Sequence, residues 1–142
     1  MYAFGHANKL AYLKESYYNR YVNMKSAVHR FHRDHFEACK LSADGIQKAI
    51  CEAWGNAEAY QTAYLSQLIA GAFSSINNYY YKTSTLTLKE RIIAVERLCE
   101  DNQLLKAIEK SNYGGIHARW ISKKNKVALI LYAKLANWKH GR

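Results

Sequence analysis

The sequence predicts a mainly α fold: a helical bundle around one long central helix, with a short extended arm or β-hairpin at the N-terminus. Three observations support this fold class. The 142 residues include no proline, the residue that most strongly breaks helices. About half of the residues are apolar, which is enough for a packed core in a chain of this length. Apolar residues between positions 57 and 81 recur every four positions, as they do along one face of a helix.

The length predicts one domain, in which we distinguish an extended arm (1–25), a helical core (26–113) and a basic amphipathic tail (114–142). Within the arm, the stretch over 9–22 is rich in Leu, Tyr and Val, and it favours an extended backbone around a polar break. Ser26 is the expected N-cap of the first core helix.

Residues 42–45 either interrupt the first core helix or belong to it, and the sequence leaves both alternatives open. Gly55 is expected to end it, because glycine is the common residue just after a helix. From 57 to about 81 we expect the long central helix, with small polar groups such as Ser75 on the side opposite its apolar stripe.

Two further helices complete the expected core. Thr87 and Glu90 fit a capping box, in which each side chain binds the other residue's backbone amide. The helix that follows is expected to bury Leu88, Ile92, Val95 and Cys99. A short helix is expected over 102–110, and a turn at the glycine pair 114–115.

The net charge of +10 is concentrated in the tail, where residues 114–142 hold seven basic residues and no acidic one. Such a segment favours anionic partners: phosphate, nucleic acid or acidic lipid. No apolar stretch of about eighteen residues could cross a bilayer, and the first residues do not resemble a secretory leader. We therefore expect a cytoplasmic protein, free or peripheral on the inner face of the membrane.

The last helix is expected to begin after Asn125, its cap, and to run to about Lys139. Its apolar stripe consists of Val127, Leu131, Leu135 and Trp138. Basic side chains around this stripe are typical of an interfacial helix. The predicted membrane contacts are Lys123, Lys124, Lys126, Lys134, Trp138 and Lys139. In the competing interpretation the same stripe packs onto the long helix and is unavailable to lipid.

The most conspicuous cluster of reactive side chains contains His29, His32, His35 and Cys39. On a helix, several of these would share one arc and could bind a metal together. That arc is also the apolar face, so we expect core or interface histidines, and we expect no cofactor. The three cysteines are too few and too widely spaced for a disulfide framework, which favours free thiols. No glycine-rich phosphate loop and no Asp-x-Asp pair is present.

The order of these features resembles the C-terminal helical region of bacterial family 2 glycosyltransferases. The likeness rests on the arm KLAYLKESYYNRY (9–21), the segment KERI (89–92) and the basic, aromatic tail. It implies an accessory domain in cell-surface polysaccharide synthesis that works beside a catalytic half or subunit and does not catalyse glycosyl transfer alone. The nucleotide-sugar domain of the family, with its Asp-x-Asp motif, is missing here. The resemblance implies that Tyr18, Arg20 and Ser26 lie at the junction with the catalytic half. There Arg20 either binds an acceptor phosphate or has a structural role and pins the arm.

Two functions from other classes stay open at this point. The charge and the twelve tyrosines are compatible with a nucleic-acid-binding protein, although no recognition motif is present. A structural homodimer joined through the tyrosine-rich long helix is the other alternative.

Overall fold

The computed structural model describes residues 30–56, 58–111 and 115–139, and these form helices and no strand. In chain order, the helices are α2 (His35–Trp54), α3 (Glu58–Tyr79), α4 (Leu88–Cys99), α5 (Asn102–Lys110), α6 (Ile116–Ser122) and α7 (Lys126–Lys139). The predicted mainly α bundle is therefore confirmed, and the predicted extended arm lies outside the described residues.

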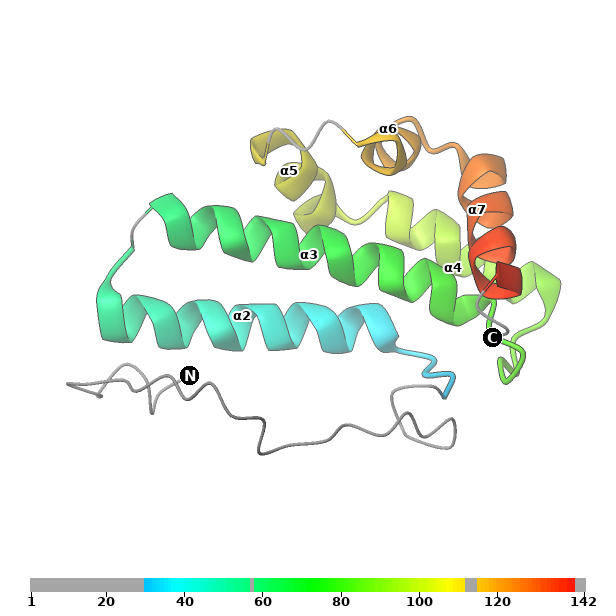
Figure 1. Cartoon of the computed structure of the whole chain (residues 1–142), viewed down its shortest axis with the longest axis horizontal. Coiled ribbons are helices and arrows are strands. Elements are labelled where there is room, and N and C mark those ends of the chain that lie inside the picture. Colours follow the sequence, from blue (N-terminus) through cyan, green and yellow to red (C-terminus); the bar gives the residue numbers. More distant parts are fainter. Residues whose placement is uncertain (1–29, 57, 112–114, 140–142) are drawn as a thin grey trace, which may run out of the picture.

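Helices α2 and α3 form a long hairpin in which they lie side by side (Figure 1). Gly55 ends α2, as predicted: it has a φ of 80°, and its amide donates to the carbonyl of Cys51 at 3.0 Å. Gly71 of α3 faces Cys39 of α2 so closely that a Cβ at position 71 would lie 2.9 Å from the Cβ of Cys39. The missing side chain at Gly71 therefore sets how closely the two helices pack.

The start of α2 differs from the sequence prediction. Ser26 lies outside the described residues, and residues 30–34 are not helical, so the helix begins only at His35. Asn78 of α3 holds the preceding segment, because its Nδ2 donates to the carbonyl of His32 at 2.7 Å and its Oδ1 accepts from the same residue's amide at 3.1 Å. These bonds satisfy the backbone of His32 outside a helix. Residues 42–45 lie inside α2 and do not interrupt it.

Helix α3 is central, as predicted, and contacts α2, α4, α5 and α7. Its stripe of Leu68, Ala72 and Ile76 is fully buried in the core. Ser75, which we expected on a polar side, is also fully buried, so that prediction is wrong. The Ser75 hydroxyl donates to the carbonyl of Gly71 at 2.7 Å within the same helix, and this bond lets it enter the core without an unsatisfied donor.

The capping box at the start of α4 is confirmed. Thr87 Oγ1 accepts from the amide of Glu90 at 3.3 Å, and Glu90 Oε2 accepts from the amide of Thr87 at 2.8 Å. Leu88, predicted to be buried, is exposed at the first position of the helix, and Leu86 fills the core there in its place. The buried residues of α4 are Val95, Leu98 and Cys99.

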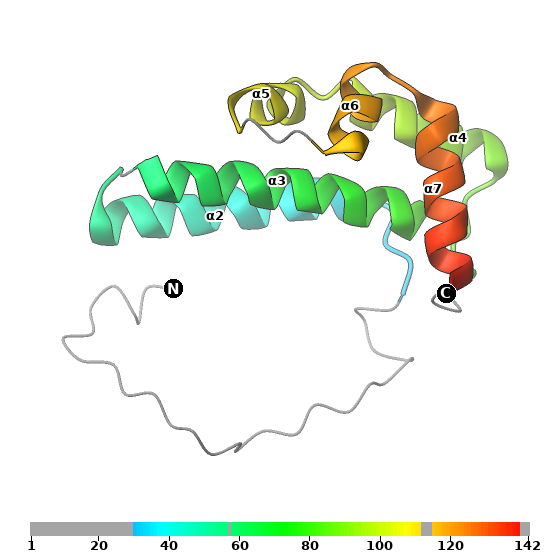
Figure 2. The same ribbon diagram turned by 45° about the horizontal axis from the view of Figure 1, so that its top comes forward.

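The tail contains two helices, whereas the sequence predicted one. Helices α5 and α6 lie over α3, and α7 crosses the C-terminal end of α3 (Figure 2). Helix α6 was not predicted as a separate element, and it begins after Gly115. Asn125 caps α7 as predicted, because its Oδ1 accepts from the amide of Ala128 at 3.1 Å. The core lies between α3 and the layer formed by α4 to α7.

Candidate functional site

Of the site residues predicted from the sequence, Tyr18, Arg20 and Ser26 lie outside the described residues. The structure therefore does not place the predicted junction with a catalytic half. The predicted membrane contacts are all described, and they belong to α7 and the turn before it. The candidate site is built from this part of the chain.

One face of α7 attaches the helix to the bundle. Leu129, Ala133 and Asn137 follow one another at intervals of four residues and are all buried. Asn137 donates from Nδ2 to the carbonyl of Asn77 at 2.9 Å, at the end of α3. Two small or medium apolar side chains and one amide thus hold α7 against α3 and α4.

The opposite face of α7 carries the apolar stripe that the sequence singled out, and it is exposed. Val127 is 67%, Leu131 55%, Leu135 63% and Trp138 83% exposed. At 100° per residue these four side chains and Lys134 fall within an arc of roughly 100°. The interpretation in which this stripe packs onto the long helix is therefore wrong, because α3 receives the other face.

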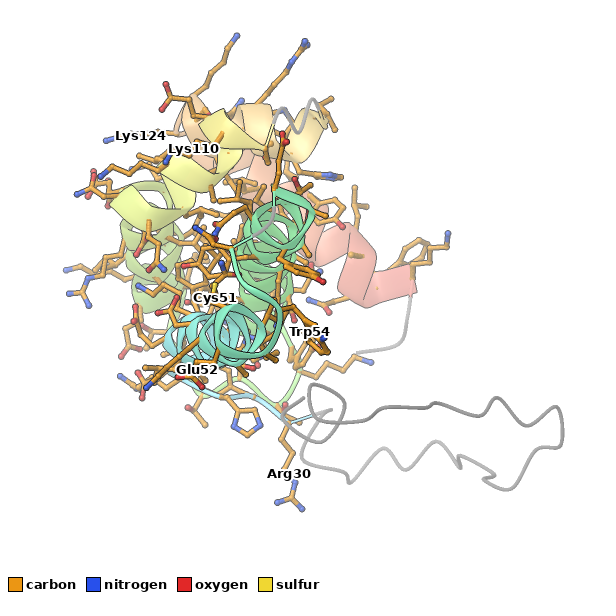
Figure 3. The ribbon with its side chains drawn as sticks, turned by 90° about the vertical axis from the view of Figure 1, so that its left-hand side faces the viewer. Arg30, Cys51, Glu52, Trp54, Lys110 and Lys124 are labelled. Carbon is orange, nitrogen blue, oxygen red and sulfur yellow. The ribbon has the colours of Figure 1, made fainter. Side chains whose placement is uncertain are left out.

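The lysines near the stripe divide into two groups. Lys124 pairs with Glu100 at 3.3 Å, and Lys126 pairs with Glu96 at 2.7 Å, so these two tie the start of α7 to α4. The hydrogen bond from Lys126 lowers the pKa of Glu96 and raises that of Lys126. Figure 3 shows Lys124 on the α4 side of the molecule. The second group, Lys123, Lys134 and Lys139, is exposed and has no ion pair among the described residues.

A cluster of half-buried rings flanks α7 on the α6 side. The ring of His117 lies 5.3 Å from that of Phe73, 5.2 Å from that of Trp120 and 4.2 Å from that of Tyr132, centroid to centroid. Sequence reasoning missed this cluster because its members come from α3, α6 and α7. The spacing of three between His117 and Trp120, which places both rings on one side of a short helix, was the available signal.

The histidine cluster does not form a metal site in the described part of the chain. No group of three or more His, Cys, Asp or Glu residues there is placed to hold a metal ion, and His29 lies outside that part. His35 Nδ1 lies 2.9 Å from Ser75 Oγ, and Cys39 Sγ lies 3.5 Å from the same nitrogen. Burial, and then the charge of His32, lower the pKa of His35. The pair His35 and Cys39 therefore belongs to the interface between α2 and α3.

The serine beside His35 is not arranged as a nucleophile. Ser75 is fully buried and donates its proton to Gly71, so its oxygen can only accept from His35 Nδ1. The three cysteines are free thiols, and burial raises the pKa of Cys99 to about 11. Tyr79 and Tyr80 are buried, which leaves them unavailable for stacking on bases. Among the described helices, none combines the length and apolar character needed to cross a membrane.

Comparisons of the chain with protein-family models, with curated proteins and with solved structures found no match.

Proposed function

We propose that this chain is an accessory helical domain that rests on an anionic membrane surface through the outer face of α7. The observation that carries this proposal is the exposure of Val127, Leu131, Leu135 and Trp138 on one face, beside lysines that form no ion pair among the described residues. Large apolar side chains gathered on one face of a helix indicate an interaction surface, and basic neighbours fit that surface to acidic lipid.

The expected strength is that of reversible binding. Each lysine near an anionic surface contributes about 1 kcal/mol, which gives about 3 kcal/mol for Lys123, Lys134 and Lys139 together. Each of the four apolar side chains adds about 1 kcal/mol if roughly half of its surface leaves water. The cost of immobilising the protein offsets much of this sum, so binding is reversible.

The geometry also supports one orientation of α7 on a membrane surface. Its 14 residues span about 21 Å at 1.5 Å per residue, less than a hydrocarbon core of about 30 Å. Because Leu129, Ala133 and Asn137 hold the inner face to the bundle, the outer face can meet lipid without any unpacking. The helix then lies in the plane of the headgroups.

The resemblance to family 2 glycosyltransferases gives this surface a role. Many enzymes of that family act on lipid-linked acceptors, and a domain lying on the membrane would hold a catalytic partner near them. We expect the isolated chain to bind no UDP-sugar, because it contains no Asp-x-Asp motif for a metal-bound diphosphate. Calorimetry with UDP-sugars and Mn²⁺ tests this, and tight metal-dependent binding would overturn the assignment as an accessory domain.

Flotation of the full chain with liposomes tests the membrane proposal. Vesicles with anionic lipid should carry the protein at low salt, and neutral vesicles should not. The double variant Leu131→Gln/Leu135→Gln and the triple variant Lys123→Glu/Lys134→Glu/Lys139→Glu should each weaken binding at least about tenfold.

Two matched controls are Leu41→Gln and Lys110→Glu, which change exposed residues of α2 and α5 and should bind like the parent protein. Equal binding to neutral vesicles, or equal losses in the controls, would contradict the proposal.

A homodimer is the second candidate for the same face. Val127, Leu131, Lys134 and Trp138 are spaced by four, three and four residues, as at the seam of two paired helices. Light scattering separates the candidates, because a dimer that Leu131→Gln/Leu135→Gln dissociates would assign the stripe to self-association. Nucleic-acid binding, the third class, predicts a gel shift with a steep salt dependence.

A further inference from the structure

The exposed apolar surface of α7 continues onto α6. Ile116, the first residue of α6, is 57% exposed, and Trp120 follows four residues later on the same side of that helix. The half-buried ring of Trp120 lies 6.5 Å from that of Tyr132 on α7, centroid to centroid. Tyr132 in turn precedes Leu135, a member of the exposed stripe, by three positions. Neighbouring apolar side chains therefore form one surface from Ile116 to Leu135.

Packing fixes the aromatic rings at the centre of this surface. The ring of His117 lies between helices, close to those of Trp120, Tyr132 and, on α3, Phe73. Trp and Tyr each combine a large apolar body with one polar group, and such side chains are enriched where a bilayer meets water. Trp120 and Tyr132 therefore suit the boundary between lipid and water.

The charges on α6 and α7 are all of one sign. Residues 115–139 contain six basic residues and no acidic one. Arg119 lies about 60° from Ile116 around α6 and is exposed, and it forms no ion pair among the described residues. Lys123, which follows α6 on the same side, is also exposed. A surface of this charge attracts acidic lipid and repels a second copy of itself.

The arrangement of the helices lets α6 and α7 meet one surface. Figures 1 and 2 show α6 and the start of α7 next to each other, on the side of α3 opposite to α2. Trp54 ends α2 at the turn of the hairpin, far from this surface (Figure 3). The tryptophans at 54 and 120 therefore report on different parts of the molecule.

We propose that α6 belongs to the membrane-binding surface, so that Ile116, Arg119 and Trp120 enter the headgroup region of the same anionic bilayer as the outer face of α7. This inference rests on the proposed function and extends it to a second helix. A single helix on a membrane can roll about its own axis. A contact through α6 lies off the axis of α7, so it fixes how the whole domain is oriented and leaves Trp54 in water.

Tryptophan fluorescence tests this orientation in the full chain. The vesicles contain phosphatidylserine and a phosphatidylcholine whose acyl chains carry bromine, which quenches tryptophan at short range. The variant Trp54→Phe/Trp138→Phe, which keeps only Trp120, should lose fluorescence relative to the same vesicles without bromine. Trp54→Phe/Trp120→Phe should be quenched as well, whereas Trp120→Phe/Trp138→Phe should not. Flotation establishes that each variant is bound, and circular dichroism that each is folded.

The outcomes separate this inference from the proposed function. Quenching of Trp138 without quenching of Trp120 would show that α7 binds the membrane alone, so the contact through α6 would be wrong while the proposed function stands. Failure of the parent protein to float with anionic vesicles would overturn both. Quenching of Trp54 to the same extent as Trp120 would contradict the proposed orientation.

Substitutions on α6 provide a second test. Ile116→Gln/Arg119→Glu should weaken binding to anionic vesicles at least about tenfold, and Arg119→Lys, which keeps the charge, should bind like the parent. The matched control Leu41→Gln/Lys48→Glu makes the same changes at exposed positions of α2 and should also bind like the parent. Equal losses in the two double variants would show that net charge alone governs binding, and the contact through α6 would then be refuted.

Discussion

Two glycines in the long hairpin should respond in opposite directions to the same substitution. Gly45 is an exposed residue inside α2, and a Cβ added there meets nothing within 4 Å. Gly45→Ala should therefore raise the free energy of unfolding by about 1 kcal/mol, the difference in helix propensity between glycine and alanine. Gly71→Ala gains the same propensity, but its Cβ would lie 2.9 Å from the Cβ of Cys39.

Comparing the two variants isolates the free-energy cost of the steric clash at position 71. The Cβ of Cys39 is fixed to the backbone of α2, so the helices themselves must move apart, and such overpacking costs about 1–3 kcal/mol. Because the propensity gain cancels between the variants, Gly71→Ala should be less stable than Gly45→Ala by about 1–3 kcal/mol. For a chain of this length, each kcal/mol of lost stability lowers the Tm by about 2–4 °C.

Urea unfolding followed by far-UV circular dichroism measures both variants. A double-mutant cycle with Cys39→Gly, which removes the opposing Cβ, should show a favourable coupling of about 1–2 kcal/mol. If Gly71→Ala were as stabilising as Gly45→Ala, the close approach of α2 and α3 at this point would be refuted.

Three further predictions concern the remaining contacts of the fold. Asn137→Ala should destabilise the protein by about 1–2 kcal/mol, because it removes a buried hydrogen bond, whereas Trp138→Ala should change its stability by less than about 0.5 kcal/mol in urea unfolding. Thr87→Ala should cost about 1 kcal/mol in the same assay, since it removes half of the capping box of α4. Burial, and then the charge of His32, lower the pKa of His35 from 6.5 in the folded state. As the pH falls, the imidazole of His35 therefore takes up a proton in the unfolded chain before it does so in the folded protein. The free energy of unfolding should therefore fall as the pH drops below about 6.5, and His35→Gln should flatten this dependence; an unchanged slope would show that His35 is not its source.

Local signals in the sequence predicted local structure well. The capping box of Thr87 and Glu90, the cap at Asn125 and the stop at Gly55 are all confirmed, because each depends on backbone groups within a few residues. The start of α2 was wrong because Asn78, far along the chain, binds the backbone of His32 and keeps it out of the helix. No pattern near His32 could reveal that contact.

Which face of a helix is buried was harder to predict, as α7 illustrates. Both faces of this helix carry apolar side chains, and the outer face, which has the larger ones, was the more visible in the sequence. Its inner face contains Ala133 and Asn137. The small side chain of Ala133 suits a close contact, and the amide of Asn137 binds a carbonyl at the end of α3. The choice between the two faces thus depends on the partner helix.

The hairpin of α2 and α3 has a consequence for the order in which the chain folds. Its two helices are consecutive and joined by the short turn at Gly55, so pairing them closes only a short loop. Helix α7, by contrast, reaches α3 across a long separation, since Asn137 binds a carbonyl 60 residues earlier. We expect the hairpin to assemble while the C-terminal third is still being synthesised, and α7 to dock last. Native-state hydrogen exchange should then find the amides of α7 opening at lower free energy than those of α3.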